Sequence, residues 1–319
     1  MDEPAESDPA ELRTSVLTSE RPALINLSYR MLGSLAEAED AVQEAYTRWL
    51  ALTPDERRTI KSPGAWLSTV VSRICLDLLG SARIRRERYV GEWLPEPVPD
   101  PHEWSPLTST PADPADRITL DESVDMAFLV VLDAMTPAER VSFLLHDVFG
   151  YPFAEIAGIV GRTPAACRQL ASSARRRLRG ARPVETPLAE RAEVVRKFKQ
   201  AWQAADIEAL ITLLDPAVSA VADGGGRAPA LSHPVHGADE VARFLVALGD
   251  RVSRMELMER TVNGQPGLVA WEHGHPVAVY AFDLSPAAGL GPSRPRIVRM
   301  WAVTNPEKLR SWTGRPPRD

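Results

Sequence analysis

The sequence predicts a multidomain fold with two all-α helical lobes followed by a C-terminal α+β domain. Apolar residues recur at spacings of three and four through residues 21–180, which indicates amphipathic helices. Strand-like runs separated by glycines follow from residue 217 onward. The chain has 319 residues, enough for two or three domains, and its 44% hydrophobic and 25% charged residues are typical of a globular protein.

The first lobe is predicted at residues 21–90, after an acidic tail at 1–20 that we expect to be disordered. The tail holds six acids against one arginine. Ser34, with Glu37 three residues later, forms a candidate capping box at the start of a helix. A further amphipathic helix is predicted from Ser62 to Tyr89, with Pro63 in its first turn and basic residues in its last turns.

A proline-rich linker is predicted at residues 91–120. Seven of the 28 prolines lie between Pro95 and Pro114. Proline removes a backbone donor and restricts the residue before it, so this segment cannot be a helix. Residues 91–125 hold nine acids against one arginine. We therefore expect an extended, acidic connector between the two helical lobes.

The second lobe, residues 121–182, contains a predicted helix-turn-helix at 153–177. Ala157 is small where two helices would cross, and Gly161 falls in the turn, where a left-handed backbone is needed. Thr163 is a candidate N-cap and Pro164 the first residue of the second helix. Upstream, Thr136 and the proline after it predict a helix over 137–149, and the inward side chains of the motif are expected to be Ile156, Val160, Cys167 and Leu170.

The C-terminal domain is predicted at residues 188–312. Two amphipathic helices, around 194–202 and 207–214, precede strand-like runs at 217–222, 252–262, 267–272, 276–283 and 296–303, with a helix at 239–248 among them. Helices followed by an antiparallel meander indicate an α+β domain.

The charges are segregated in a way that predicts nucleic-acid binding at two places. The whole chain carries −6, which taken alone argues against a polyanion partner. Residues 57–90, however, hold eight bases against two acids, and residues 162–182 hold seven arginines and no acid. Solvated helix faces explain a single basic run, but two such runs at the ends of apolar helices favour nucleic acid.

The candidate DNA contacts lie in these two basic runs. Side chains near the N-terminal end of the second helix of a helix-turn-helix can reach base edges in the major groove, whereas later arginines suit phosphates. Aromatic residues interleaved with arginine in the first run suit opened or single-stranded DNA, although Trp66 is more simply a core residue. The candidates are Arg73, Arg83, Arg85, Arg86, Arg162, Thr163, Arg168, Gln169, Ser172, Arg175 and Arg176.

Other functions find little support in the sequence. Cys75 and Cys167 cannot form a disulfide framework or a four-cysteine metal site, and we expect reduced thiols in a cytoplasmic protein without a membrane segment. Possible acid–base groups in the C-terminal domain are Asp223, His233, His236, His273, His275 and Asp283, but the histidines are more simply loop residues. We expect no catalytic, metal or cofactor site.

Residues 21–180 resemble the extracytoplasmic-function group of sigma-70-type transcription initiation factors. The resemblance rests on residues 33–49, residues 62–77 and the helix-turn-helix. In that family the first segment binds the β′ clamp of RNA polymerase, which the resemblance places on Asp40, Gln43 and Glu44. The second segment melts and reads the −10 element, and the helix-turn-helix reads the −35 element. The expected partners are therefore core RNA polymerase, through its β′ clamp and β flap, and promoter DNA.

Three further strings resemble the subgroup of these factors that carries a C-terminal, cone-shaped SnoaL-like domain. They are residues 93–97, 223–227 and 305–309. The resemblance implies that this domain modulates activity in cis, and we expect the second and third strings to dock on the helical lobes. In the family the acidic linker threads the polymerase cleft. The resemblance assigns regulatory contacts between domains to Trp93, Pro95, Glu96, Asp223, Gly225, Arg227, Asn305 and Lys308.

Two alternatives remain open at this stage. A one-component regulator would bind an operator with the helix-turn-helix and sense a small molecule in the SnoaL-like domain, but it leaves residues 40–44 and the linker without a role. An enzyme with a DNA-binding appendage would need a catalytic constellation that the sequence does not reveal.

Overall fold

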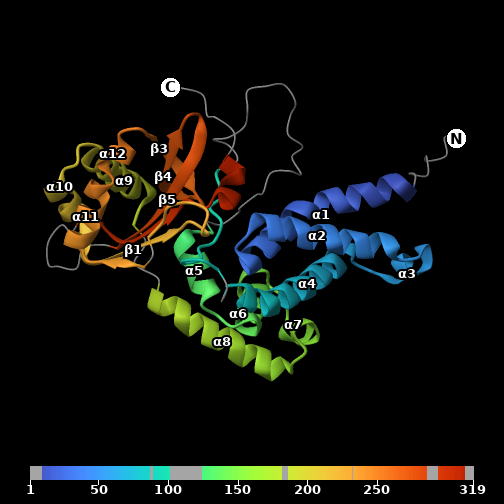
Figure 1. The fold of residues 1–319 in the computed structure, drawn as a ribbon. Helices are drawn as coiled ribbons and strands as arrows, with labels where there is room; N and C mark the ends of the chain where they lie inside the picture. The colour runs from blue at the N-terminus through green and yellow to red at the C-terminus, as the bar shows by residue number, and fades with distance from the viewer. Residues whose placement is uncertain are drawn as a thin grey trace. The chain divides into compact units, whose positions relative to one another are not determined.

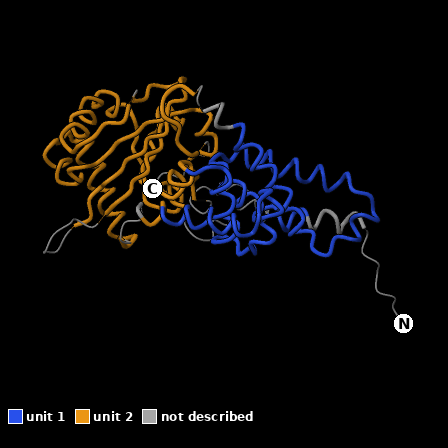
Figure 2. Tube along the Cα trace, turned by 90° about the horizontal axis from the view of Figure 1, so that it is seen from below, with its two compact units in different colours: residues 1–83, 109–121, 135–176 blue, residues 84–108, 122–134, 177–319 orange. Residues whose placement is uncertain are grey.

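A computed structural model describes residues 9–86, 89–100, 124–181, 186–231, 233–285 and 294–312. Within these ranges, none of the helices combines the length and the apolar character that crossing a bilayer requires. The chain divides into two compact units, which are coloured separately in Figure 2. Unit 1 holds residues 1–83, 109–121 and 135–176, and unit 2 holds residues 84–108, 122–134 and 177–319.

The first half of unit 1 is built from four helices (Figure 1): α1 (Pro9–Leu32), α2 (Leu35–Ala51), α3 (Pro54–Thr59) and α4 (Pro63–Arg86). Ser34 is the N-cap of α2 and accepts a hydrogen bond from the Glu37 backbone, as predicted. Helix α3 was not predicted; it begins with a complete capping box between Thr53 and Glu56. The buried core includes Leu27, Met31, Val42, Leu67 and Val71.

The N-terminal tail differs from its predicted disorder, because α1 already begins at Pro9. Proline is favourable at the first position of a helix, so Pro9 suits this start. Residues 1–8 lie outside the described part of the chain, so the prediction of disorder there stays a prediction.

The second half of unit 1 contains α6 (Pro137–Phe143), a π-helical turn η2 (Leu144–Val148), α7 (Phe153–Val160) and most of α8 (Pro164–Ala181). Thr136 and Glu139 form a capping box at the start of α6, as the sequence predicts. Arg140 is buried and donates to the carbonyl of Met31 at 2.7 Å, so α6 is fixed to α1.

Unit 2 is organised around a six-stranded sheet of order β2-β1-β6-β5-β4-β3. Its strands are β1 (Leu214–Asp223), β2 (Val235–His236), β3 (Glu256–Val262), β4 (Gln265–Glu272), β5 (His275–Ser285) and β6 (Arg296–Val303). β3 to β6 form the predicted antiparallel meander, but β1 pairs with β6 in parallel. The parallel pairing of β1 with β6 was not predicted, because the hydrophobic pattern of a strand does not encode its distant partner.

One face of the sheet is covered by helices. They are α9 (Leu188–Gln203), α10 (Ile207–Leu213), α11 (Ala238–Ala247) and the short α12 (Gly249–Val252). Phe198, Trp202, Tyr280 and Phe282 interlock in the core on this side, with ring centroids 5.1–5.8 Å apart in edge or tilted contacts. This arrangement is the predicted cone of helices on a curved sheet.

The opposite face of the sheet is covered by segments from outside the cone. Its apolar cluster contains Val269, Val279 and Trp301 of the sheet, Leu94 of the linker and Met126 of α5 (Met126–Asp133), together with Leu309 and Trp312 of the 3-10 helix η3 (Pro306–Trp312). The start of the linker and the first helix of the second lobe therefore belong to unit 2 by packing.

Candidate functional site: DNA-facing helices and a docked linker

The helix-turn-helix forms as the sequence predicts. Gly161 ends α7 with a left-handed backbone, φ +68° and ψ +38°. Thr163 Oγ1 accepts a hydrogen bond from the Ala166 amide at 3.2 Å at the start of α8. Of the predicted inward residues, Ile156 and Cys167 are buried, whereas Val160 and Leu170 are half-buried.

The outer surface of the motif carries the predicted DNA-binding side chains. Ser172 and Arg175 are half-buried, and Arg175 Nε lies 2.6 Å from Asp147 Oδ1. The exposed members are Arg162, Thr163, Arg168, Gln169 and Arg176. α8 therefore presents cations along its length to solvent, as a groove-binding helix requires.

The first basic run lies on α4. Arg73 is exposed, and its Nη2 donates to the Gly158 carbonyl of α7 at 3.2 Å. Arg83, Arg85 and Arg86 occupy the last turns of α4, and their side chains lie outside the described part of the chain. Trp66 is half-buried with its ring centroid 5.3 Å from that of Trp49, in keeping with a role in the core.

The predicted polymerase-binding residues share an exposed face of α2. Asp40, Gln43 and Glu44 are all exposed, while Ala41, Val42 and Ala45 on the same helix are buried. Glu44 pairs with Arg48 at 3.0 Å on the surface. The face thus offers acids and an amide to a partner.

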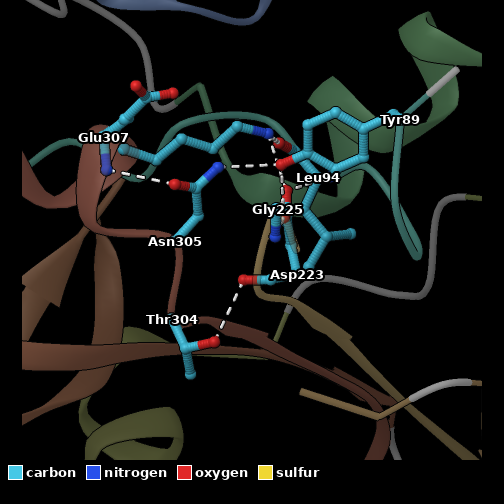
Figure 3. A network of polar contacts seen from close by, with 8 residues as sticks. Tyr89, Leu94, Asp223, Gly225, Thr304, Asn305 and Glu307 are labelled. Atoms are coloured by element: carbon cyan, nitrogen blue, oxygen red, sulfur yellow. Dashed lines mark hydrogen bonds and ion pairs between the residues drawn. The ribbon is translucent and has the colours of Figure 1, made fainter. Parts of the chain in front are cut away.

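A buried carboxylate fixes the start of the linker to the sheet of unit 2 (Figure 3). Asp223, at the end of β1, is fully buried. Its Oδ1 accepts from Tyr89 Oη at 2.6 Å, and its Oδ2 accepts from the Leu94 amide at 2.9 Å. Lys308 Nζ of η3 lies 2.6 Å from Oδ2 and also donates to the Leu94 carbonyl. We refer to these four residues, together with Asn305, as the Asp223 network.

Aromatic rings enclose the cation of this network. Lys308 Nζ lies 4.1 Å from the ring centroid of Trp93 and 5.3 Å from that of Tyr89. Asn305 Nδ2 donates to Tyr89 Oη at 2.8 Å. Burial and the neighbouring Asp223 carboxylate raise the pKa of Tyr89 above its ordinary value, so the phenol stays a neutral donor.

The glycine turn after Asp223 is shaped by its neighbours. Gly225 has φ +59°, and its amide donates to Asp223 Oδ1 at 3.1 Å. A Cβ on Gly225 would lie 2.4 Å from Asn305 Nδ2 and 3.0 Å from Tyr89 Oη. Arg227 is exposed and pairs with Glu307 of η3 at 3.0 Å. The close approach of Asn305 and Tyr89 therefore explains the glycine at position 225.

The linker stays docked beyond Leu94. Pro95, Glu96 and Val98 are buried. The amide of Val98 donates to Asn263 Oδ1 at 3.1 Å, its carbonyl accepts from the Asn263 amide at 2.9 Å, and Trp312 Nε1 donates to the Pro97 carbonyl at 2.8 Å. Residues 89–99 therefore form an extended segment on the sheet.

This docking bears on two expectations. Residues 223–227 and 305–309 contact Tyr89, at the end of the predicted first lobe, and residues 305–309 and Asp223 contact Leu94 of the linker; docking on the rest of the helical lobes stays a prediction. Tyr89 was expected to suit DNA, and the structure bonds its hydroxyl to Asp223 and Asn305. The aromatic and acidic composition of the segment gave no sign of these partners, which are more than 100 residues away in the sequence.

A second buried acid lies on the same face of the sheet. Asp283 of β5 stands directly opposite Arg299 of β6, and Arg299 Nη2 lies 2.8 Å from Asp283 Oδ2. Burial raises the pKa of Asp283, and Arg299 opposes the shift. The N-cap of α5, Asp125, adds a further increase to that pKa.

The other acid–base candidates do not converge. His233, His236, His273 and His275 are exposed, and His273 lies with Gly274 in the tight turn between β4 and β5. In the described part of the chain, no group of three or more histidine, cysteine or acidic residues could hold a metal ion.

Comparison with known proteins accounts for this architecture. Residues 16–87 match the family Sigma-70 region 2, and residues 125–178 match Sigma-70, region 4. The chain is 38% identical over 308 residues to the ECF RNA polymerase sigma factor SigJ of Mycobacterium tuberculosis, covering 93% of this chain and 92% of the relative. This chain belongs to the extracytoplasmic-function family of RNA polymerase sigma factors.

Two further relatives support the assignment. The probable ECF RNA polymerase sigma factor SigI of Mycobacterium tuberculosis is 35% identical over 83% of this chain and 86% of its own length. The crystal structure of the Mycobacterium tuberculosis extracytoplasmic function sigma factor SigJ superposes with a TM-score of 0.69 at 33% identity, over 93% of this chain and 98% of that one. The predicted fold class, two helical lobes with a C-terminal α+β domain, is confirmed.

Proposed function

We propose that this sigma factor directs core RNA polymerase to promoters and that its C-terminal domain modulates this activity in cis by holding the linker. The Asp223 network is the observation that supports the second part. It ties residues 89–99 to the sheet through a buried ion pair, a carboxylate–amide hydrogen bond and a phenol donor.

The polymerase contact is proposed on the exposed face of α2. Asp40, Gln43 and Glu44 would meet the β′ clamp of the polymerase, because an acidic helical face suits a basic partner. The second lobe would contact the β flap while its helix-turn-helix faces DNA.

The promoter contacts are proposed on α4 and α8. Arg73, Arg83, Arg85 and Arg86 would bind the opened −10 region, where charge attracts the exposed strand. Arg162, Thr163, Arg168, Gln169 and Ser172 would face the −35 bases, with Arg175 and Arg176 on phosphates.

The linker gives the C-terminal domain a means of modulation. In the family that this chain resembles, the acidic linker occupies the polymerase cleft. The segment containing Trp93, Pro95 and Glu96 cannot lie in that cleft and on the sheet together. Asp223, Gly225, Arg227, Asn305 and Lys308 would therefore set the fraction of chains whose linker is free.

Run-off transcription with core RNA polymerase tests both parts. The full chain should raise initiation from selected promoters above that of core polymerase alone; no increase would contradict the sigma function. A chain ending at residue 304 loses Lys308, Leu309 and Trp312, and its promoter-specific output should change. Arg310→Ala, which changes an exposed residue of the same 3-10 helix, is the matched control and should behave like the wild type. Equal output from all three chains would contradict modulation by the linker.

A small-molecule ligand of the C-terminal domain remains a prediction. The helix-covered face of the sheet is filled by interlocking buried rings, which favours a structural role for that core.

A further inference from the structure

Three side chains form a stack beside the DNA-facing helix α8. The rings of His146 and Phe153 lie nearly parallel, with centroids 3.9 Å apart and an interplanar angle of 28°. The guanidinium carbon of Arg168 lies 5.3 Å from the Phe153 ring centroid. Arg168 itself is exposed, on the second turn of α8.

The π-helical turn η2 supplies the base of this stack. A π-turn inserts an extra residue into a helix and often occurs at functional positions. Here its wider hydrogen bond runs from the Phe149 amide to the Leu144 carbonyl at 3.1 Å. His146 Nδ1 lies 2.9 Å from the Tyr151 carbonyl, which can only accept, so Nδ1 donates and the ring is fixed in orientation.

The same turn also holds a second arginine of α8. Asp147 Oδ1 accepts from Arg175 Nε at 2.6 Å. Two adjacent residues of η2 therefore restrain two arginines two turns apart on α8, one through an aromatic ring and one through an ion pair.

We propose that Phe153 and His146 are positioning residues that orient Arg168 for a bidentate contact with a guanine of the −35 element. The inference rests on the proposed function, since it deepens the promoter contact. Arginine reads guanine through O6 and N7 in the major groove only if its planar fork is held in the plane of the base. Neither Phe153 nor His146 needs to touch the DNA.

The stack contributes by ordering Arg168 before binding. A free arginine loses its rotamer freedom when it binds, and a pre-oriented guanidinium loses less. We therefore expect loss of the Phe153 ring to lower the preference for that one guanine by roughly three- to ten-fold and to leave other base preferences unchanged.

Selection from a promoter pool tests the inference. The full chain and core RNA polymerase transcribe double-stranded templates randomised across the −35 region, and the templates of the transcripts are sequenced. The wild type should enrich one motif, and Arg168→Ala should abolish the preference for one guanine in it. Phe153→Leu should reduce the preference for the same guanine, and His146→Ala should reduce that preference by a smaller factor. Phe153→Tyr, which keeps the ring, should retain the preference.

Phe149→Leu is the matched control. It also removes a ring under an arginine, since the Arg30 guanidinium lies 5.9 Å from the Phe149 ring centroid, but Arg30 is a buried residue of α1. This control should keep the wild-type motif. Thermal unfolding of every variant shows whether it folds, and His146→Ala carries the test if Phe153→Leu does not fold.

The outcomes separate this inference from the proposed function. If the wild type enriches no motif, the promoter-directing function is contradicted. If the wild type enriches a motif that Phe153→Leu or Arg168→Ala leaves intact, the positioning role is overturned. A uniform loss of preference at all positions, or the same loss in Phe149→Leu, would likewise overturn it.

Discussion

Removing the cation of the Asp223 network should release the linker. Asp223 is fully buried, and Lys308 keeps only 10% of its side-chain surface exposed. Lys308→Met would leave a buried carboxylate without its cation, which costs about 3–5 kcal/mol in comparable buried pairs. At about 1.4 kcal/mol per factor of ten, opening of the linker should become roughly 100- to 4,000-fold more frequent.

Hydrogen exchange measures this opening directly. The Leu94 amide donates to Asp223 and the Asn263 amide donates to the Val98 carbonyl, so both are protected while the linker is docked. Mass spectrometry of peptides covering residues 89–100 and 256–265 should show faster exchange in Lys308→Met. Peptides from α2 should exchange as in the wild type.

A double-mutant cycle separates the ion pair from the loss of packing. Asp223→Asn leaves the ammonium without its carboxylate, whereas combining Asp223→Asn with Lys308→Met leaves no buried charge. The double variant should therefore lose clearly less free energy of linker docking than the sum of the losses in the two single variants. Unchanged exchange in Lys308→Met, or simple additivity of the two changes, would refute the reasoning.

Three further predictions concern the glycine turn, the second buried acid and α8. Gly225→Ala should destabilise linker docking by about 1–3 kcal/mol in the same exchange assay, since it adds a clash to a left-handed backbone; Gly274→Ala, with φ +81° and no atom within 4 Å of its Cβ, controls for backbone strain alone. Burial raises the pKa of Asp283, so the folded state holds this proton more tightly than the unfolded state and the protein loses stability as the pH rises from the ordinary pKa of 3.8 through the raised pKa. Asp283→Asn should remove that loss, seen in urea unfolding as a stability difference between the two proteins that grows as the pH rises above about 4. Arg175→Ala should reduce the salt dependence of promoter binding by about one ion, and an unchanged slope would contradict phosphate contact by Arg175.

Local elements were predictable because their signals lie within a few residues. Ser34 begins α2, Thr136 begins α6, and Gly161 with Thr163 forms the turn of the helix-turn-helix. Capping and backbone conformation depend on neighbours along the chain, so a single sequence reveals them. The approximate positions of β1 and of β3 to β6 were predicted for the same reason, from alternation and glycine turns, whereas the short β2 was not predicted.

Pairing between distant segments was not predictable in this way. Strand β1 pairs in parallel with β6, and α5 packs on the sheet. The hydrophobic pattern of each of these segments does not specify which distant segment it will contact. The resemblance to a subgroup marked Asp223 and Lys308 as important, but their meeting around Leu94 follows only from the fold. The place of Tyr89 in the Asp223 network was not predicted, because an aromatic residue among arginines suits DNA and a hydrogen-bonded network equally well.

The energetics of the docked linker constrain how this sigma factor could be activated. Leu94 and Val98 are almost completely buried, and burying two such side chains contributes at most about 3–6 kcal/mol. The Asp223 network opposes release as well, so the undocked linker is a minor state. If core polymerase accepts only that state, its apparent affinity falls in proportion to the undocked fraction. Lys308→Met should then bind core polymerase more tightly than the wild type, by the same factor that it adds to linker opening. Equal affinities of the two chains would mean that the polymerase binds without displacing the linker.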